Sequence, residues 1–195
     1  MRNRFLFLPV VTLLLFWGTR SPGHAQIYAK LASVTSNGNG YTYTYDLSLA
    51  SGATVQYGDF VTIYDCRSLI PGTNFQPVGW TFSSSDLGKT PSHIRATDSS
   101  SYPNLTWMYA GSATLGPGPL DIGNFGVNAT SGSIIVTDYA SQAHLYAPGE
   151  PGNNKLMYLL SYTGGAHAAA PSRRWWALLP VGLLPLGLLL RARRL

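Results

Sequence analysis

The sequence is poor in the residues that build disulfides, metal centres and acid–base pairs. Its 195 residues include one cysteine, four histidines and one glutamate. Because Cys66 has no second cysteine to pair with inside the chain, stability must come from packing and not from an internal disulfide. An isolated cysteine in a strand-rich chain is more often a small core residue than a nucleophile, and we interpret Cys66 in this way.

The chain also lacks the short motifs that carry common catalytic and metal chemistry. It contains no HxH or HExxH pair, no GxSxG turn, no phosphate-binding glycine loop and no DxDxDG calcium loop. We therefore predict no catalytic residue, metal ligand or cofactor, and we expect a protein that is not an enzyme. One alternative is a hydrolase in which Cys66 and His144 converge. Another is a structural calcium ion bound by some of four aspartates: Asp86, Asp98, Asp121 and Asp138.

Paired carboxylates of the kind that hydrolyse glycosides are missing as well. Asp59 and Asp65 flank one predicted strand on the same face, about 20 Å apart, which is too far for direct cooperation. The only glutamate, Glu150, stands in a turn rich in glycine and proline. We interpret the acids as solubilising and turn-forming residues. Asn104-Leu105-Thr106 and Asn128-Ala129-Thr130 match the N-glycosylation pattern.

A surplus of positive charge is absent from the middle of the chain. The formal net charge of the whole sequence is +5, but eight of the thirteen positive residues lie in the two terminal segments. Between residues 26 and 170, five positive residues stand against eight acids, which leaves a net charge of −3. Nucleic-acid binding requires a basic patch or stripe, so we expect no nucleic-acid partner.

Helical periodicity is absent between residues 26 and 165. Residues 41–49 alternate in polarity with period two, which predicts a half-buried strand, and residues 59–65 are apolar on both faces, as in a central strand. Gly/Pro turns about every ten residues predict an all-β, antiparallel β-sandwich or jelly-roll-like domain over residues 26–163. Residues 83–103 are predicted to be a surface loop, and residues 164–174 a linker. The remaining expected strands are 27–34, 78–82, 105–109, 122–127, 134–139 and 156–162.

Aromatic side chains are the most suggestive binding feature of this domain. Tyr41, Tyr43 and Tyr45 share one face of a predicted strand. If that face is exposed, it offers a platform on which sugar rings can stack; if it is buried, it is core, which is the commoner outcome for such a pattern. Exposure of these tyrosines or of Trp80 distinguishes the two.

The N-terminal segment has the three parts of a secretory signal peptide. Arg2 and Arg4 are basic, residues 5–17 are apolar, and residues 20–25 end in the small residue Ala25. This pattern predicts a signal peptide over residues 1–25 and a mature chain that starts at Gln26. The alternative is an uncleaved N-terminal anchor.

The C-terminal segment, residues 175–195, has the features of a membrane-spanning helix. Its apolar run from Ala177 to Leu190 carries no charge, follows Trp175 and Trp176, and ends in three arginines. A helix over residues 175–190 would be about 24 Å long, a little short of a hydrocarbon core of about 30 Å. The arginines are expected on the cytoplasmic side. The alternative, a helix packed on the domain, would show a polar face, and this run has none.

This architecture resembles the PEP-CTERM class of exported bacterial proteins, whose members end in a Pro-Glu-Pro motif, an apolar helix and an arginine cluster. Residues 177–190 and Arg191, Arg193 and Arg194 match the helix and the cluster, whereas Pro171-Ser172-Arg173 keeps only the first proline of the motif. The resemblance implies processing by an exosortase-like enzyme, an inner-membrane intermediate, and release to the envelope, surface or extracellular space. It also implies association with exopolysaccharide or biofilm. A carbohydrate-binding or adhesive module permanently tethered to the membrane is the alternative.

Overall fold

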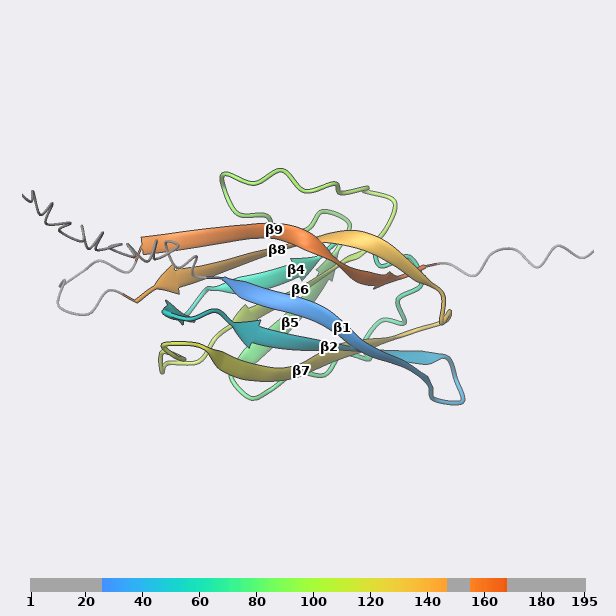
Figure 1. Cartoon of the computed structure of the whole chain (residues 1–195). Coiled ribbons are helices and arrows are strands. Elements are labelled where there is room, and N and C mark those ends of the chain that lie inside the picture. The colour runs from blue at the N-terminus through green and yellow to red at the C-terminus, as the bar shows by residue number, and fades with distance from the viewer. Residues whose placement is uncertain (1–25, 147–154, 168–195) are drawn as a thin grey trace, which may run out of the picture.

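The computed structural model describes residues 26–146 and 155–167, and within these ranges the chain is all-β, with no helix (Figure 1). Every strand pairing is antiparallel, so the predicted fold class is confirmed at this level. The strands are β1 (Ile27–Ser36), β2 (Tyr41–Leu49), β3 (Ala53–Thr54), β4 (Phe60–Ile63), β5 (Trp80–Ser85), β6 (Asn104–Tyr109), β7 (Leu120–Ala129), β8 (Ile134–Leu145) and β9 (Lys155–Ala166).

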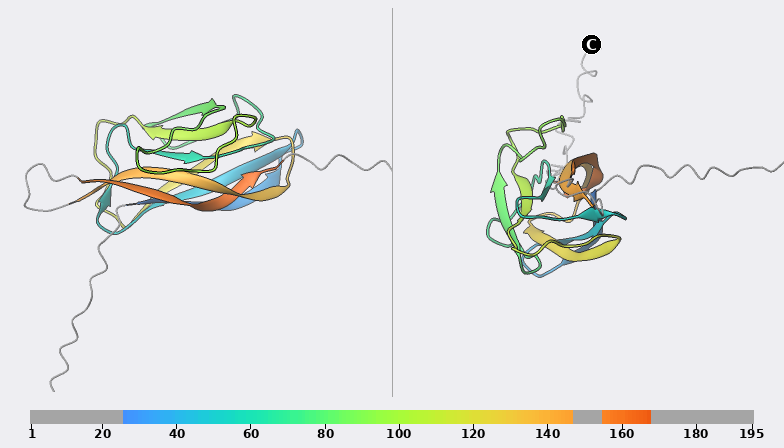
Figure 2. Two further views of the ribbon diagram at one scale, coloured as in Figure 1. Left: turned by 90° about the horizontal axis from the view of Figure 1, so that it is seen from above. Right: turned by 90° about the vertical axis from the view of Figure 1, so that its left-hand side faces the viewer.

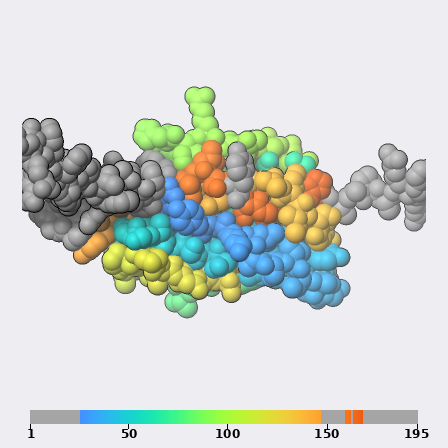
Figure 3. Space-filling view, in the orientation of Figure 1, coloured from blue at the N-terminus to red at the C-terminus, as the bar shows by residue number. Residues whose placement is uncertain are grey.

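The strands form two sheets. One has three strands in the order β1-β2-β7, and these lie side by side on one surface of the molecule (Figure 3). In the other, β8 pairs with β9 along one edge and with β3 and β4 along the opposite edge, and β6 and β5 follow β4. The free edge of β7 is covered by the segment after β4, because Phe75 exchanges two backbone hydrogen bonds with Gly126.

Alternation along β2 decides which side of the three-stranded sheet faces the core. Tyr43, Tyr45, Leu47 and Leu49 are buried, and the residues between them are partly exposed, as the period of two predicts. Aromatic rings fill the space between the sheets. The ring centroid of Trp107 on β6 lies 6.0 Å from that of Tyr45 and 5.8 Å from that of Phe125 on β7.

The outer face of the larger sheet is covered by the loop of residues 86–103, which runs over β4 (Figure 2). This cover explains why all four residues of β4 are buried although only one of its faces meets the core. Carboxylates hold the loop. The backbone N–H of Thr97 donates to Asp138 at 2.6 Å, that of Ser99 to Asp65 at 3.0 Å, and that of Gly88 to Asp98 at 2.9 Å.

The predicted boundaries differ from the observed ones at the end of the domain. The linker was expected from residue 164, but β9 continues to Ala166, with Gly164 and Gly165 paired to Val136 and Ile135. Glycine contributes no side chain to an apolar pattern, whereas its backbone pairs like any other. The two-residue strand β3 is too short to leave a pattern. Residues 83–85 of the expected loop belong to β5.

Three predictions lie outside the described residues: the signal peptide over residues 1–25, most of the linker, and the C-terminal segment of residues 175–195. Among the residues that the structure does describe, there is no helix of the length and apolarity needed to cross a membrane.

Candidate functional site

The aromatic residues singled out as a sugar platform are mostly core residues. Tyr43 and Tyr45 have no exposed surface, and Trp80 is 5% exposed, with its ring against Tyr109 and Phe125. The platform interpretation is therefore wrong for these three residues, and the core interpretation is confirmed. Only Tyr41 of the predicted stripe is partly exposed.

Cys66 and His144 do not converge. Cys66 is fully buried, and burial raises the pKa of its thiol to about 12, so it is not a reactive thiolate. Cys66 lies next to Ala166, which pairs with Ile134 at the start of β8. His144 lies ten residues from Ile134 along β8, or about 30 Å at the rise of a strand. The hydrolase built on this pair is excluded by geometry.

Several acids have structural roles, and the interpretation of the acids as solubilising residues is wrong for Asp59, which is fully buried and bonded to His144. Asp65, Asp98 and Asp138 accept hydrogen bonds from backbone N–H groups of the loop over β4. No group of three or more histidine, cysteine or acidic side chains arranged to bind a metal occurs in residues 26–146 and 155–167. The first sequon is blocked, because Asn104 is buried and its amide bonds to Asp98.

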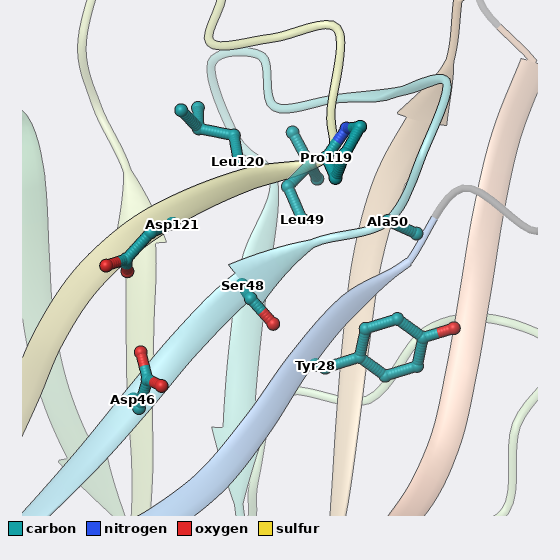
Figure 4. Close-up of a pocket in the computed structure, with 8 residues that line it drawn as sticks. All are labelled: Tyr28, Asp46, Ser48, Leu49, Ala50, Pro119, Leu120 and Asp121. Atoms are coloured by element: carbon teal, nitrogen blue, oxygen red, sulfur yellow. The ribbon is translucent and has the colours of Figure 1, made fainter.

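A groove at one end of the three-stranded sheet brings together side chains that sequence reasoning left apart. It is open to solvent, has a volume of about 540 Å³, and is lined by Tyr28, Asp46, Ser48, Leu49, Ala50, Pro119, Leu120 and Asp121 (Figure 4). These residues come from β1, from β2 and the residue after it, and from β7 with the proline before it.

Strand register positions the polar residues of this groove. Tyr28 on β1 is paired with Ser48 on β2, and Ser48 is paired with Asp121 on β7, so the three side chains form a row across the sheet. Asp46 lies two residues along β2 and therefore points to the same side as Ser48. Figure 4 shows the Ser48 hydroxyl between the Tyr28 ring on one side and the two carboxylates on the other.

The groove combines an exposed aromatic ring with hydrogen-bonding groups. Tyr28 is 43% exposed, so its ring offers apolar surface at the rim. The face of an aromatic ring carries partial negative charge and attracts the C–H groups of a flat ligand. Ser48 can donate or accept hydrogen bonds, and the carboxylate oxygens of Asp46 and Asp121 accept them. A polyhydroxylated ring with one apolar face fits these groups.

The sequence contains only part of the signal for this site. The alternation along β2 places Asp46 and Ser48 opposite the core face, which is correct. It does not say that β1 and β7 are the neighbours of β2, since β7 follows it after seventy residues. Tyr28 and Asp121 were therefore not recognised as members of one site. No protein-family model and no curated protein matches the chain.

Proposed function

We propose that this chain is a non-enzymatic, exported surface or extracellular-matrix protein whose β domain binds polysaccharide in the groove around Tyr28. The observation that carries the proposal is the exposed Tyr28 ring beside the Ser48 hydroxyl and the carboxylates of Asp46 and Asp121. A pyranose has a face of C–H groups for the ring and a rim of hydroxyls for the polar side chains.

The export part of the proposal rests on the two terminal segments. A signal peptide over residues 1–25 directs the chain across the inner membrane, and the apolar helix and arginines of residues 175–195 hold it there. An exosortase-like enzyme then releases the jelly-roll-like domain to the surface or matrix, as the PEP-CTERM resemblance implies.

Affinity electrophoresis of the full chain tests the binding function. The gel contains polysaccharide purified from the surface of the native host, and retardation measures binding. We expect the wild-type chain to be retarded and Tyr28→Ala to bind about fivefold more weakly, since an aromatic contact contributes about 1 kcal/mol. The matched control is Tyr57→Ala, which removes a tyrosine that is 74% exposed and does not line the groove.

The proposal fails if the wild-type chain migrates equally in gels with and without polysaccharide. It also fails if Tyr57→Ala weakens binding as much as Tyr28→Ala does. Both variants change exposed side chains, so neither is expected to unfold the domain.

A further inference from the structure

The charges that line the groove have one sign. Asp46 and Asp121 contribute two carboxylates, and none of the eight lining residues is a lysine, arginine or histidine. Lys30 is directly opposite Asp46 on the neighbouring strand and on the same face, so it offsets part of this charge although it does not line the groove. The lining residues themselves present negative charge next to the Tyr28 ring.

The two carboxylates are close enough to act on one ligand group. Ser48 is directly opposite Asp121, and Asp46 is two residues from Ser48 on the same face, although the register of the two strands shifts between Leu47 and Ser48. In a regular antiparallel pair such diagonal neighbours are about 7–8 Å apart, and Figure 4 shows both carboxylates on the same side of Ser48. A cation placed between them is attracted by both, and an anion is repelled by both.

We infer that the groove selects polysaccharides that carry free ammonium groups, such as polymers of de-N-acetylated amino sugar, over neutral and uronate polymers. This inference rests on the proposed polysaccharide binding and adds its charge class. An amino sugar keeps the C–H face that stacks on Tyr28 and adds an ammonium group for Asp46 and Asp121. A uronate brings a third carboxylate to a groove that already contains two.

Three oligosaccharides of equal length separate the classes. Isothermal titration calorimetry of the full chain in detergent micelles compares pentamers of glucosamine, N-acetylglucosamine and galacturonate. We expect the glucosamine pentamer to bind about fivefold more tightly than the N-acetylated one, the effect of about 1 kcal/mol from exposed charge pairs. Galacturonate should bind most weakly. The preference should collapse in about 0.5 M NaCl, where screening shortens the range of these charges.

Variants test whether the preference for the glucosamine pentamer arises in the groove. The double variant Asp46→Asn with Asp121→Asn should bind the glucosamine and N-acetylglucosamine pentamers equally. Asp86→Asn is the control, because it removes the same kind of charge from an exposed loop residue outside the groove, and it should keep most of the preference. Lys30→Gln should increase the preference, since it removes the nearest opposing charge on the sheet.

Different results would contradict the charge selection and the polysaccharide binding on which it rests. If the N-acetylglucosamine pentamer binds as tightly as the glucosamine pentamer at low salt, the charge selection is wrong and polysaccharide binding stands. The same holds if Asp86→Asn removes the preference as fully as the groove double variant. If none of the three pentamers and no host polysaccharide binds, the proposed function itself is wrong.

Discussion

Nδ1 of His144 lies 2.8 Å from Oδ2 of Asp59, a residue with no exposed surface. The same carboxylate accepts the backbone N–H of Gln56 at 2.8 Å and the amide of Gln142 at 3.3 Å. Burial raises the pKa of Asp59, and the hydrogen bonds from Gln56, His144 and Gln142 act in the opposite direction. The interaction joins the turn between β3 and β4 to β8.

Replacing His144 should destabilise the fold in a pH-dependent way. His144→Ala leaves Asp59 buried with less compensation, which should cost about 2 kcal/mol at pH 7, measured by urea unfolding. The loss of His144 raises the pKa of Asp59 further. A carboxyl whose pKa is higher in the folded than in the unfolded chain stabilises the fold as the pH falls through the folded value, so the deficit should shrink in acid.

A double variant checks that the deficit comes from the unpaired carboxylate. Asp59→Asn in the His144→Ala background removes the charge but keeps an oxygen for the Gln56 N–H, so it should recover much of the lost stability. An equal deficit for His144→Ala at pH 7 and in acid would contradict this explanation.

Two tyrosines on the core face of β2 should respond differently to loss of the hydroxyl. The Tyr43 hydroxyl lies 2.7 Å from the Ser133 carbonyl and 3.0 Å from that of Ser131, whereas the buried Tyr45 hydroxyl has no hydrogen-bond partner within residues 26–146 and 155–167. We expect Tyr43→Phe to lower the free energy of unfolding by about 1 kcal/mol and Tyr45→Phe to leave it unchanged or raise it. Denaturant midpoints of the two variants measure this, and a larger loss for Tyr45→Phe would refute it.

Alkaline pH should unfold the domain through the same residues. Burial raises the pKa of Tyr43 to about 12 and that of Tyr45 well above the ordinary value of about 10. Between these values the folded chain binds more protons than the unfolded chain, so stability falls as the pH rises above about 10. In a spectroscopic titration, phenolate absorbance from the buried tyrosines should appear together with loss of β structure. Phenolate absorbance from the buried tyrosines in a chain that keeps its β structure would contradict this prediction.

Intact-mass analysis of the protein recovered from its native host tests the processing proposal. We expect a species that begins at Gln26, ends before Trp175 and occurs outside the inner membrane, because the proposed processing removes both terminal segments. A species that keeps Leu195 and stays in the inner membrane would identify residues 175–195 as a permanent anchor. The domain would then be a tethered periplasmic module.

The local pattern of apolar and polar residues predicted most of the strands, because the side chains of a strand alternate between the buried and the exposed face of its sheet. The alternation over residues 41–49 matches β2, and the apolar run over residues 59–65 contains β4, the central strand. This pattern is absent where the residues are glycines, which have no side chain. Gly164 and Gly165 therefore looked like a linker, although their side-chain space is occupied by Leu31 and Thr137 and their backbone completes β9.

By itself, the sequence determined the class of fold, the core face of β2 and the expectation of export, because periodicity, turn residues and terminal apolar runs are local properties. Only the tertiary structure decided which strands are neighbours. It paired Asp59 with His144 across 85 residues, and it placed Tyr28 in a row with Ser48 and Asp121. Contacts between strands that are distant in the chain depend on the order of strands in the sheet and on their register. Neither can be deduced from a single stretch of sequence.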